Sequence, residues 1–242
     1  MKKKVIIILS VIVGFITLVL TGFFIYVSTY YRALDKVENY LKTTDTVIVK
    51  EYKNYYTFEG TNVKKGLIFY PGGLVESKSY APLLYELASN GYLCILLEMP
   101  FNLAVFDINA ADGIKDEYSY IDEWYIGGHS LGGSMAASYL KKNQDDYDGL
   151  ILFASYSTVD FSDSNLRVIS VYGEFDEVLN MENYEKSKSN LPSDFVEIVI
   201  EGGCHAYFGT YGNQKGDGEP QITNEIQIER TVEVLLLFLK DW

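Results

Sequence analysis

One serine in this sequence lies in a pattern that is typical of a nucleophile. Ser130 is the central residue of a G-x-S-x-G motif over residues 128–132, which follows an apolar stretch and precedes a helical pattern. A serine on a sharp strand-to-helix turn exposes its Oγ, and small residues around it let the strand and the helix approach closely. The alternative is a glycine-rich turn in which Ser130 only caps a helix. The flanking strand and helix patterns favour the nucleophile.

A serine hydroxyl needs a base within hydrogen-bond reach, and the chain has only two histidines, His129 and His205. His129 is adjacent to Ser130, and neighbouring side chains on such a turn point apart, so we expect His129 to pack beneath it. His205 follows the apolar stretch 195–200 on a glycine-rich loop, at the end of a predicted strand. Considered alone, His205 would pass for a surface-loop histidine. Together with the serine motif, it is the predicted base.

The third catalytic group should be a carboxylate at another strand end, where it can orient the imidazole and stabilise its charged form. Asp176 follows the apolar stretch 168–172 and lies between the serine and the histidine in the chain, which is the order expected of such a triad. Acidic residues are also common in turns for solvation alone. Three nearby carboxylates therefore remain as alternatives, namely Asp160, Glu174 and Glu177.

Acyl transfer also needs N–H donors for the oxyanion that forms in the transition state. The Leu131 N–H is the first candidate, because it begins the helix after the serine and a helix dipole favours negative charge at that end. The second should come from the loop 70–74, where glycines let backbone N–H groups face a substrate. We predict Gly73, with Leu74 as the alternative. As a phosphate-binding loop this segment lacks the required Lys-Ser/Thr ending.

Short apolar stretches and longer amphipathic stretches alternate along the chain. The apolar ones are rich in Val, Ile, Leu and aromatic residues, which is typical of buried strands, and the amphipathic ones are typical of helices. Strands are predicted at 46–51, 55–59, 66–70, 93–97, 124–127, 150–153, 168–172 and 195–200, and helices at 33–42, 80–89, 131–142, 184–189 and 222–239. This order implies a mostly parallel sheet covered on both faces, with ligands at the carboxyl ends of the strands.

Taken together, these motifs resemble the α/β-hydrolase superfamily, and within it the bacterial "fold-5" hydrolases related to dienelactone hydrolases. The resemblance covers residues 66–242 and is carried by segments 70–73, 99–104, 127–133, 172–176, 202–209 and 211–218. It implies the α/β-hydrolase fold and a triad of Ser130, Asp176 and His205. Asparagine usually precedes the histidine in this pattern, so Cys204 is a departure. Many members carry a lid where this chain has only residues 154–166, so we expect no large lid domain and an open, shallow site.

The N-terminal segment is typical of a transmembrane anchor. Residues 5–27 carry no charge and follow lysines 2–4, and a helix of this length, at about 1.5 Å per residue, spans a hydrocarbon core of about 30 Å. The alternative is a cleaved signal peptide, which has an apolar region of about 7–15 residues and a small-residue cleavage site. The lysines favour a cytoplasmic N-terminus and an extracellular catalytic domain.

The sequence thus predicts three parts: an anchor over residues 1–27, a juxtamembrane segment over 28–45 and one α/β-hydrolase domain over 46–242.

The formal net charge is -13 and becomes -16 without residues 1–27. A body this acidic repels phosphate backbones and no basic run compensates, so we expect no nucleic-acid partner. Two cysteines and two histidines are too few for a recognisable zinc cluster, so we expect no metal and no cofactor. Whether Cys94 and Cys204 form a disulfide stays open, because geometry decides pairing.

These observations predict a membrane-anchored serine hydrolase that cleaves an ester or similar acyl bond through an acyl-enzyme. Its substrate would be a small molecule, or a lipid or envelope ester near the outer face of the membrane. Two alternatives remain: an acyltransferase, and a non-catalytic extracellular binding module, because a fold does not by itself imply a function.

Overall fold

The computed structural model describes residues 2–240, which separate into two compact units on either side of the Tyr30–Tyr31 bond. The N-terminal unit is built on one helix, α1 (Lys2–Ser28). Between Lys3 and Ser28 this helix is long and apolar enough to cross a membrane, and its apolar side chains are exposed along its length. Such a helix suits a membrane anchor or a signal sequence.

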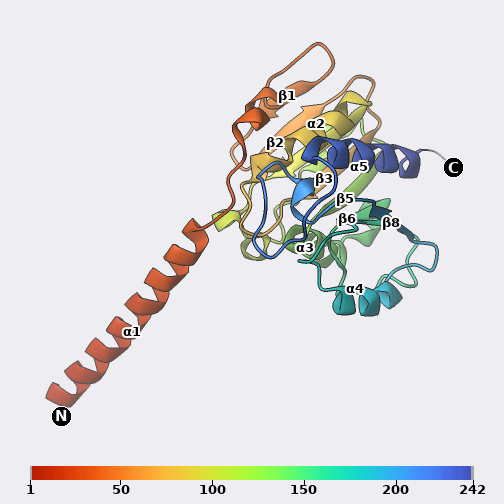
Figure 1. The fold of residues 1–242 in the computed structure, drawn as a ribbon. Coiled ribbons are helices and arrows are strands. Elements are labelled where there is room, and N and C mark those ends of the chain that lie inside the picture. The colour runs from red at the N-terminus through yellow and green to blue at the C-terminus, as the bar shows by residue number, and fades with distance from the viewer. Residues whose placement is uncertain (1, 241–242) are drawn as a thin grey trace. The chain divides into compact units, whose positions relative to one another are not determined.

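The second unit is built on an eight-stranded sheet (Figure 1). In chain order its strands are β1 (Ile48–Glu51), β2 (Tyr55–Glu59), β3 (Lys65–Tyr70), β4 (Tyr92–Leu97), β5 (Glu123–His129), β6 (Gly149–Phe153), β7 (Arg167–Gly173) and β8 (Val196–Ile200). In space the order is β1-β2-β4-β3-β5-β6-β7-β8. The β1–β2 and β2–β4 pairs are antiparallel and the other five are parallel. The predicted mostly parallel sheet is confirmed.

Helices cover both faces of this sheet. They are α2 (Ala81–Ser89), α3 (Leu131–Leu140), α4 (Met181–Ser187) and α5 (Asn224–Phe238), joined by short 3-10 turns at Asp35–Asn39, Ser77–Tyr80, Pro100–Asn102, Ala104–Phe106, Lys115–Tyr118, Gln144–Asp146, Lys188–Asn190 and Ala206–Phe208. Successive residues of a strand point to opposite faces. Leu67 and Phe69 of β3 accordingly pack in the core beneath α2 and α5, whereas Ile68 and Tyr70 pack in the core beneath α3.

Two of the predicted helices differ from the structure. The segment 33–42 contains only the 3-10 turn Asp35–Asn39, and the Leu34 N–H before it donates to the Thr210 carbonyl at 3.0 Å. This segment therefore bonds to the rest of the second unit instead of forming the backbone hydrogen bonds of a longer helix. The helix predicted at 184–189 begins earlier, at Met181, because the Asn180 side chain accepts the Asn183 N–H at 2.9 Å and caps it.

The connection between β6 and β7 is short, as predicted. It runs from residue 154 to residue 166 and contains neither helix nor strand. Within residues 2–240 no large lid covers the carboxyl ends of the strands. Cys94 and Cys204 are both buried and free, so no disulfide joins them.

Candidate active site

Ser130 lies at the turn between β5 and α3. Its φ of 52° and ψ of -123° are a costly conformation for a residue with a Cβ, as in the strained strand-to-helix turn of the G-x-S-x-G motif. Two hydrogen bonds hold it in place. The Ser130 N–H donates to the Phe153 carbonyl at 2.9 Å, and the Ser155 Oγ donates to the Ser130 carbonyl at 2.7 Å. The end of β6 and the loop after it thus fix the backbone of the turn.

The glycines at the two ends of the motif are needed for close packing. A Cβ on Gly128 would lie 2.4 Å from the Tyr70 carbonyl oxygen, and a Cβ on Gly132 would lie 2.3 Å from the same atom. No side chain fits at these distances. The turn is therefore pressed against the end of β3, which brings Ser130 beside the loop 70–74.

His205 and Asp176 form a buried pair at the ends of β8 and β7. The His205 Nδ1 lies 2.9 Å from Asp176 Oδ2 and 3.0 Å from Oδ1, and the two side chains are only 2% and 0% exposed. The N–H groups of Val178 and Leu179 donate to Asp176 Oδ1 at 3.0 and 2.8 Å and fix the carboxylate. With a proton on Nδ1, the Nε2 atom is left as an acceptor, which is the tautomer a general base needs.

The structure does not bring the three alternative carboxylates to His205. Glu174 accepts the Gly202 N–H at 2.9 Å. Asp160 is exposed and accepts both the N–H and the hydroxyl of Ser162, so hydrogen bonding lowers its pKa. Glu177 is exposed. Among the candidates from the sequence, Asp176 is the one paired with the histidine.

Ser130 and His205 line the same pocket, which has a volume of about 250 Å³. The other residues that line it are Leu131, Ser134, Ala154, Ser155, Tyr156, Val178, Leu179 and Asn180. At about 30 Å³ per water molecule, this space holds roughly eight waters, and it is smaller than the roughly 300–1,000 Å³ of pockets that enclose drug-sized ligands. The pocket encloses only a small part of any larger substrate.

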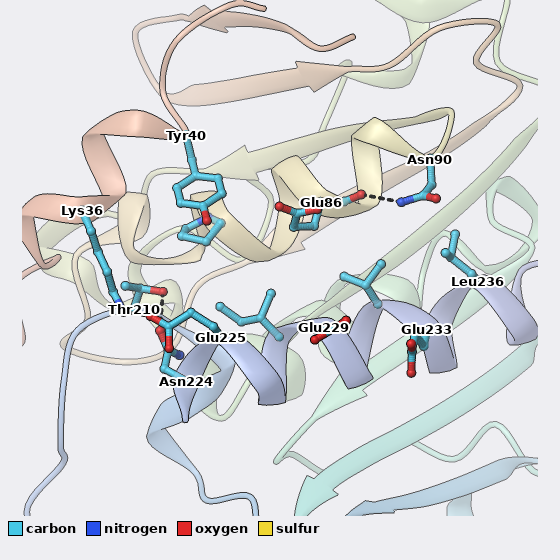
Figure 2. A pocket seen from close by; sticks show the side chains of 13 residues that line it. Lys36, Tyr40, Glu86, Asn90, Thr210, Asn224, Glu225, Glu229, Glu233 and Leu236 are labelled. Atoms are coloured by element: carbon cyan, nitrogen blue, oxygen red, sulfur yellow. Dashed lines mark hydrogen bonds and ion pairs between the residues drawn. The ribbon is translucent and has the colours of Figure 1, made fainter. Parts of the chain in front are cut away.

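A larger groove of about 480 Å³ lies elsewhere, between α2 and α5 (Figure 2). Glu86 of α2 and Glu229 and Glu233 of α5 stand along it, as Figure 2 shows. Ile228 and Val232 of α5 also line it. None of the three triad candidates lines this groove. The groove is therefore separate from the candidate active site.

Gly73 and Leu131 lie side by side at the candidate oxyanion site. A Cβ on Gly73 would lie 2.8 Å from the Leu131 Cδ2, so the loop 70–74 passes directly over the start of α3. The first N–H groups of a helix have no partner within it, which leaves the Leu131 N–H directed outward. The Leu74 N–H is already used, because it donates to the Asn102 carbonyl at 2.7 Å. The geometry favours Gly73 over Leu74 as the second donor.

His129 packs beneath the turn, as its position next to Ser130 predicts. It is 1% exposed, and its ring centroid lies 4.5 Å from that of His205. The Tyr80 hydroxyl lies 2.8 Å from His129 Nδ1 and accepts the Gly72 N–H at 3.1 Å, so its own proton points to the imidazole. Burial lowers the pKa of His129 well below its usual value, and the neighbouring His205 lowers it further. His129 is therefore uncharged, and through the Tyr80 hydroxyl it connects the serine turn to Gly72 of the oxyanion loop.

Two residues that the sequence reasoning did not single out hold the His205 loop. The Asp217 carboxylate accepts the His205 N–H at 3.2 Å and the Ala206 N–H at 2.8 Å. Gln227 of α5 accepts the Cys204 N–H at 2.9 Å and donates to its carbonyl at 2.8 Å. Asp217 lies in the segment 211–218, which is one of the segments that resemble the hydrolase family. That resemblance is the one feature of the sequence that pointed to Asp217.

Cys204, which replaces the usual asparagine, is buried at the base of this loop. Burial, together with the nearby Asp217, raises the pKa of its thiol to about 12, so the thiol stays protonated. A protonated thiol is a poor nucleophile. Within residues 2–240, no group of three or more His, Cys, Asp or Glu side chains is placed to hold a metal ion.

A mostly parallel sheet with a strained serine turn and a buried His–Asp pair at its carboxyl edge is the arrangement of an α/β hydrolase. The chain belongs to the Alpha/beta hydrolase family, which matches it over residues 66–229. Membership of this family supports a hydrolase. No curated protein sequence gives a significant match to the chain.

Solved structures share this fold. A soluble variant of monoglyceride lipase from Saccharomyces cerevisiae is 11% identical, with a TM-score of 0.57 over 84% of this chain and 98% of that one. Dienelactone hydrolase from Anabaena variabilis is 12% identical, with a TM-score of 0.56 over 81% and 99%. An alpha-beta serine hydrolase homologue from Coxiella burnetii is 14% identical, with a TM-score of 0.55 over 82% and 99%. Identities this low show the fold alone.

Proposed function

We propose that this protein is a membrane-anchored serine hydrolase that cleaves an ester or similar acyl bond through an acyl-enzyme. One observation carries the proposal. His205, which is paired with the buried Asp176 carboxylate, lines the same pocket as Ser130. A histidine held by a carboxylate next to a serine on a strained turn is what makes a serine hydroxyl nucleophilic.

The reaction follows from these positions. Ser130 Oγ attacks the carbonyl carbon while His205 Nε2 takes its proton, and Asp176 stabilises the imidazolium that forms. The N–H groups of Leu131 and Gly73 stabilise the oxyanion of the tetrahedral intermediate. As the intermediate collapses, His205 gives its proton to the leaving group. A water molecule, activated by the same histidine, then releases the acyl group from Ser130.

Pocket size limits the group that the protein encloses. A volume of about 250 Å³ suits a short acyl group. We therefore expect turnover of a panel of esters to be highest for acetyl to butyryl esters and to fall with longer acyl chains on a water-soluble leaving group.

The membrane anchor is the part of the proposal that rests on α1. A helix of 27 residues with exposed apolar side chains has no core of its own to bury them. A bilayer supplies that environment, and lysines on the N-terminal side favour a cytoplasmic N-terminus and an extracellular catalytic domain. Membrane fractionation, followed by protease protection of spheroplasts, tests the anchor and its orientation.

Labelling of the full chain in detergent micelles with a fluorophosphonate tests the catalytic part. We expect Ser130 to be labelled, Ser130→Ala and His205→Ala to abolish both labelling and ester turnover, and Ser138→Ala to keep both. Ser138 is the control because it lies further along α3 and bonds only within that helix. A folded protein that is neither labelled nor active would refute the triad and support a non-catalytic binding module. Transfer of the acyl group to an added alcohol in preference to water would identify an acyltransferase.

A further inference from the structure

Three apolar side chains are exposed together on the loop that follows β4. The side chains concerned are 46%, 44% and 50% exposed and belong to Phe101, Val105 and Phe106. The two aromatic rings contact each other edge to face, with their centroids 5.8 Å apart. We call these three side chains the apolar patch. Because β4 lies beside β3 and runs parallel to it, this loop leaves the sheet at the same edge as the loop 70–74.

The apolar patch is tied to the candidate oxyanion loop. The Asn102 carbonyl accepts the Leu74 N–H at 2.7 Å, so the patch loop and the oxyanion loop are hydrogen-bonded to each other. Leu103, next along the patch loop, would lie 3.6 Å from a Cβ on Gly73. The patch therefore lies at the rim of the candidate active site.

The first residue of the catalytic unit is bound to the same oxyanion loop. The Tyr31 N–H donates to the Leu74 carbonyl at 2.8 Å, and the Tyr31 carbonyl accepts the Glu76 N–H at 2.9 Å. Helix α1 ends at Ser28, so only residues 29 and 30 separate it from this attachment. Covalent geometry limits three residue steps to about 11 Å. The proposed anchor is therefore joined to the oxyanion loop by a short length of chain.

We infer that the apolar patch rests in the lipid headgroup region, so that the active site opens toward the bilayer and takes an acyl ester carried by a membrane amphiphile. This inference rests on the proposed function. Exposed Phe and other apolar side chains of an interfacial segment are buried at the boundary between the lipid headgroups and the acyl chains. Beyond residue 27 the chain has a formal net charge of -16, which excludes electrostatic attraction to anionic lipid as the main contact. Insertion of apolar side chains needs no such attraction.

The small pocket fits this arrangement. It receives the scissile acyl end of the substrate, while the long chain of the amphiphile stays in the bilayer beside Phe101 and Phe106. No protein tunnel for that chain is needed, and the short connection after β6 leaves the site uncovered. The leaving alcohol remains in the membrane after the ester is cleaved, and the short acid leaves in water.

A depth measurement tests the orientation without any use of activity. The full chain is placed in phosphatidylcholine vesicles with a polarity-sensitive dye on Val105→Cys, and a matched sample carries the dye on Lys64→Cys. Both native cysteines are buried, and Lys64, whose side chain is 67% exposed, lies at the opposite edge of the sheet before β3. We expect the dye at position 105 to be shielded from iodide and quenched by nitroxide-bearing lipids, and the dye at position 64 to show neither.

Two outcomes of this measurement would overturn the inference. Equal exposure of both positions to iodide would place the patch in water. Shielding from iodide without quenching by nitroxide lipids would place the patch against protein, whether a partner or a second copy of the chain.

A pair of substrates then tests the consequence for catalysis. The two are acetate esters of the same dye, one soluble and one bearing a hexadecyl chain that holds it in the vesicles. We expect Val105→Ser combined with Phe106→Ser to lower turnover of the vesicle-borne ester roughly tenfold, through lost apolar insertion, and to leave the soluble ester unchanged. Equal loss on both esters would overturn the membrane role. If wild-type protein cleaves neither ester, the hydrolase proposal fails, while the depth measurement still decides the orientation.

Discussion

Asp217 holds the backbone of the proposed base through its carboxylate. Its carboxylate accepts the N–H groups of His205 and Ala206, and an asparagine replaces one acceptor oxygen with an NH₂ group. We expect Asp217→Asn to lower kcat roughly tenfold to a hundredfold with little change in KM, because a small displacement of a catalytic group is costly. Ester kinetics of this variant and of Asp163→Asn, an exposed control, give the comparison. An unchanged kcat in Asp217→Asn would show that the His205 loop keeps its position without this carboxylate.

His129 gives stability a pH dependence whose direction follows from its burial. Its pKa lies well below the usual value in the folded protein and near 6.5 in the unfolded chain, so below about pH 6.5 the unfolded chain binds a proton that the folded one does not. The contribution of His129 to stability is therefore fully present above that pH and is lost as the pH falls. Between pH 7.5 and 5.5 the loss is about 1.4 kcal/mol from this residue alone.

Urea unfolding of the full chain in micelles at the two pH values measures this loss. We expect the free energy of unfolding of His129→Phe to change by about 1.4 kcal/mol less than that of wild type over this interval. The comparison uses the change with pH, so a general loss of stability in the variant does not affect it. The same pH dependence in both proteins would mean that folded His129 takes up a proton.

The residues of the candidate site differ in how far the sequence reveals them. Ser130 is recognisable because its motif is local, and Asp176 because strand ends and chain order narrow the choice. Tyr80 carries no such signal, and Asp217 has only its place in the segment 211–218, since both act on backbone N–H groups through hydrogen bonds that only the folded chain forms. The triad assignment itself stays a proposal for the labelling experiment to test.

At the scale of elements, the packing of α3 against the end of β3 depends on Gly132. A Cβ there would lie 2.3 Å from the carbonyl oxygens of both Tyr70 and Pro71, which are backbone atoms that a rotamer change cannot move. We expect Gly132→Ala to destabilise the fold by about 1–3 kcal/mol or more and to reduce turnover, because the helix must shift away from the serine. Thermal unfolding measures the effect, with Ser138→Ala on the same helix as control. An unchanged midpoint for Gly132→Ala would mean that α3 has room to move.

Strands were the most predictable elements. Each of the eight predicted stretches corresponds to a strand whose ends lie within two residues of the prediction. The central strands β3 to β7 are the clearest, because burial on both faces requires continuous apolar sequence. The order of the strands in the sheet, in contrast, could not be predicted. Nothing in the sequence shows that β4 lies between β2 and β3, since pairing depends on contacts between distant segments. The helix start at Met181 was missed because it depends on one capping side chain, that of Asn180.

At the scale of the whole molecule, the proposed anchor and the apolar patch are two independent restraints on the same site. The anchor reaches the oxyanion loop through Tyr31, and the patch reaches it through Asn102. Either restraint alone keeps the site near lipid, so the loss of one should matter less than the loss of both. This expectation distinguishes an enzyme whose active site is held facing the bilayer from one that is only anchored near the bilayer.

A flexible linker tests the first restraint. Insertion of 20 Gly/Ser residues after Tyr30 adds an r.m.s. span of about 25 Å between anchor and catalytic unit. We expect a several-fold loss of turnover on the vesicle-borne acetate, a much larger loss when Val105→Ser and Phe106→Ser are added, and no change on the soluble acetate. The same linker placed ahead of Met1 is the control, because it adds mass without lengthening the tether. If the linker after Tyr30 leaves the vesicle-borne ester unaffected even without the patch, the substrate reaches the site from water, and the short connection at Tyr31 has no part in its delivery.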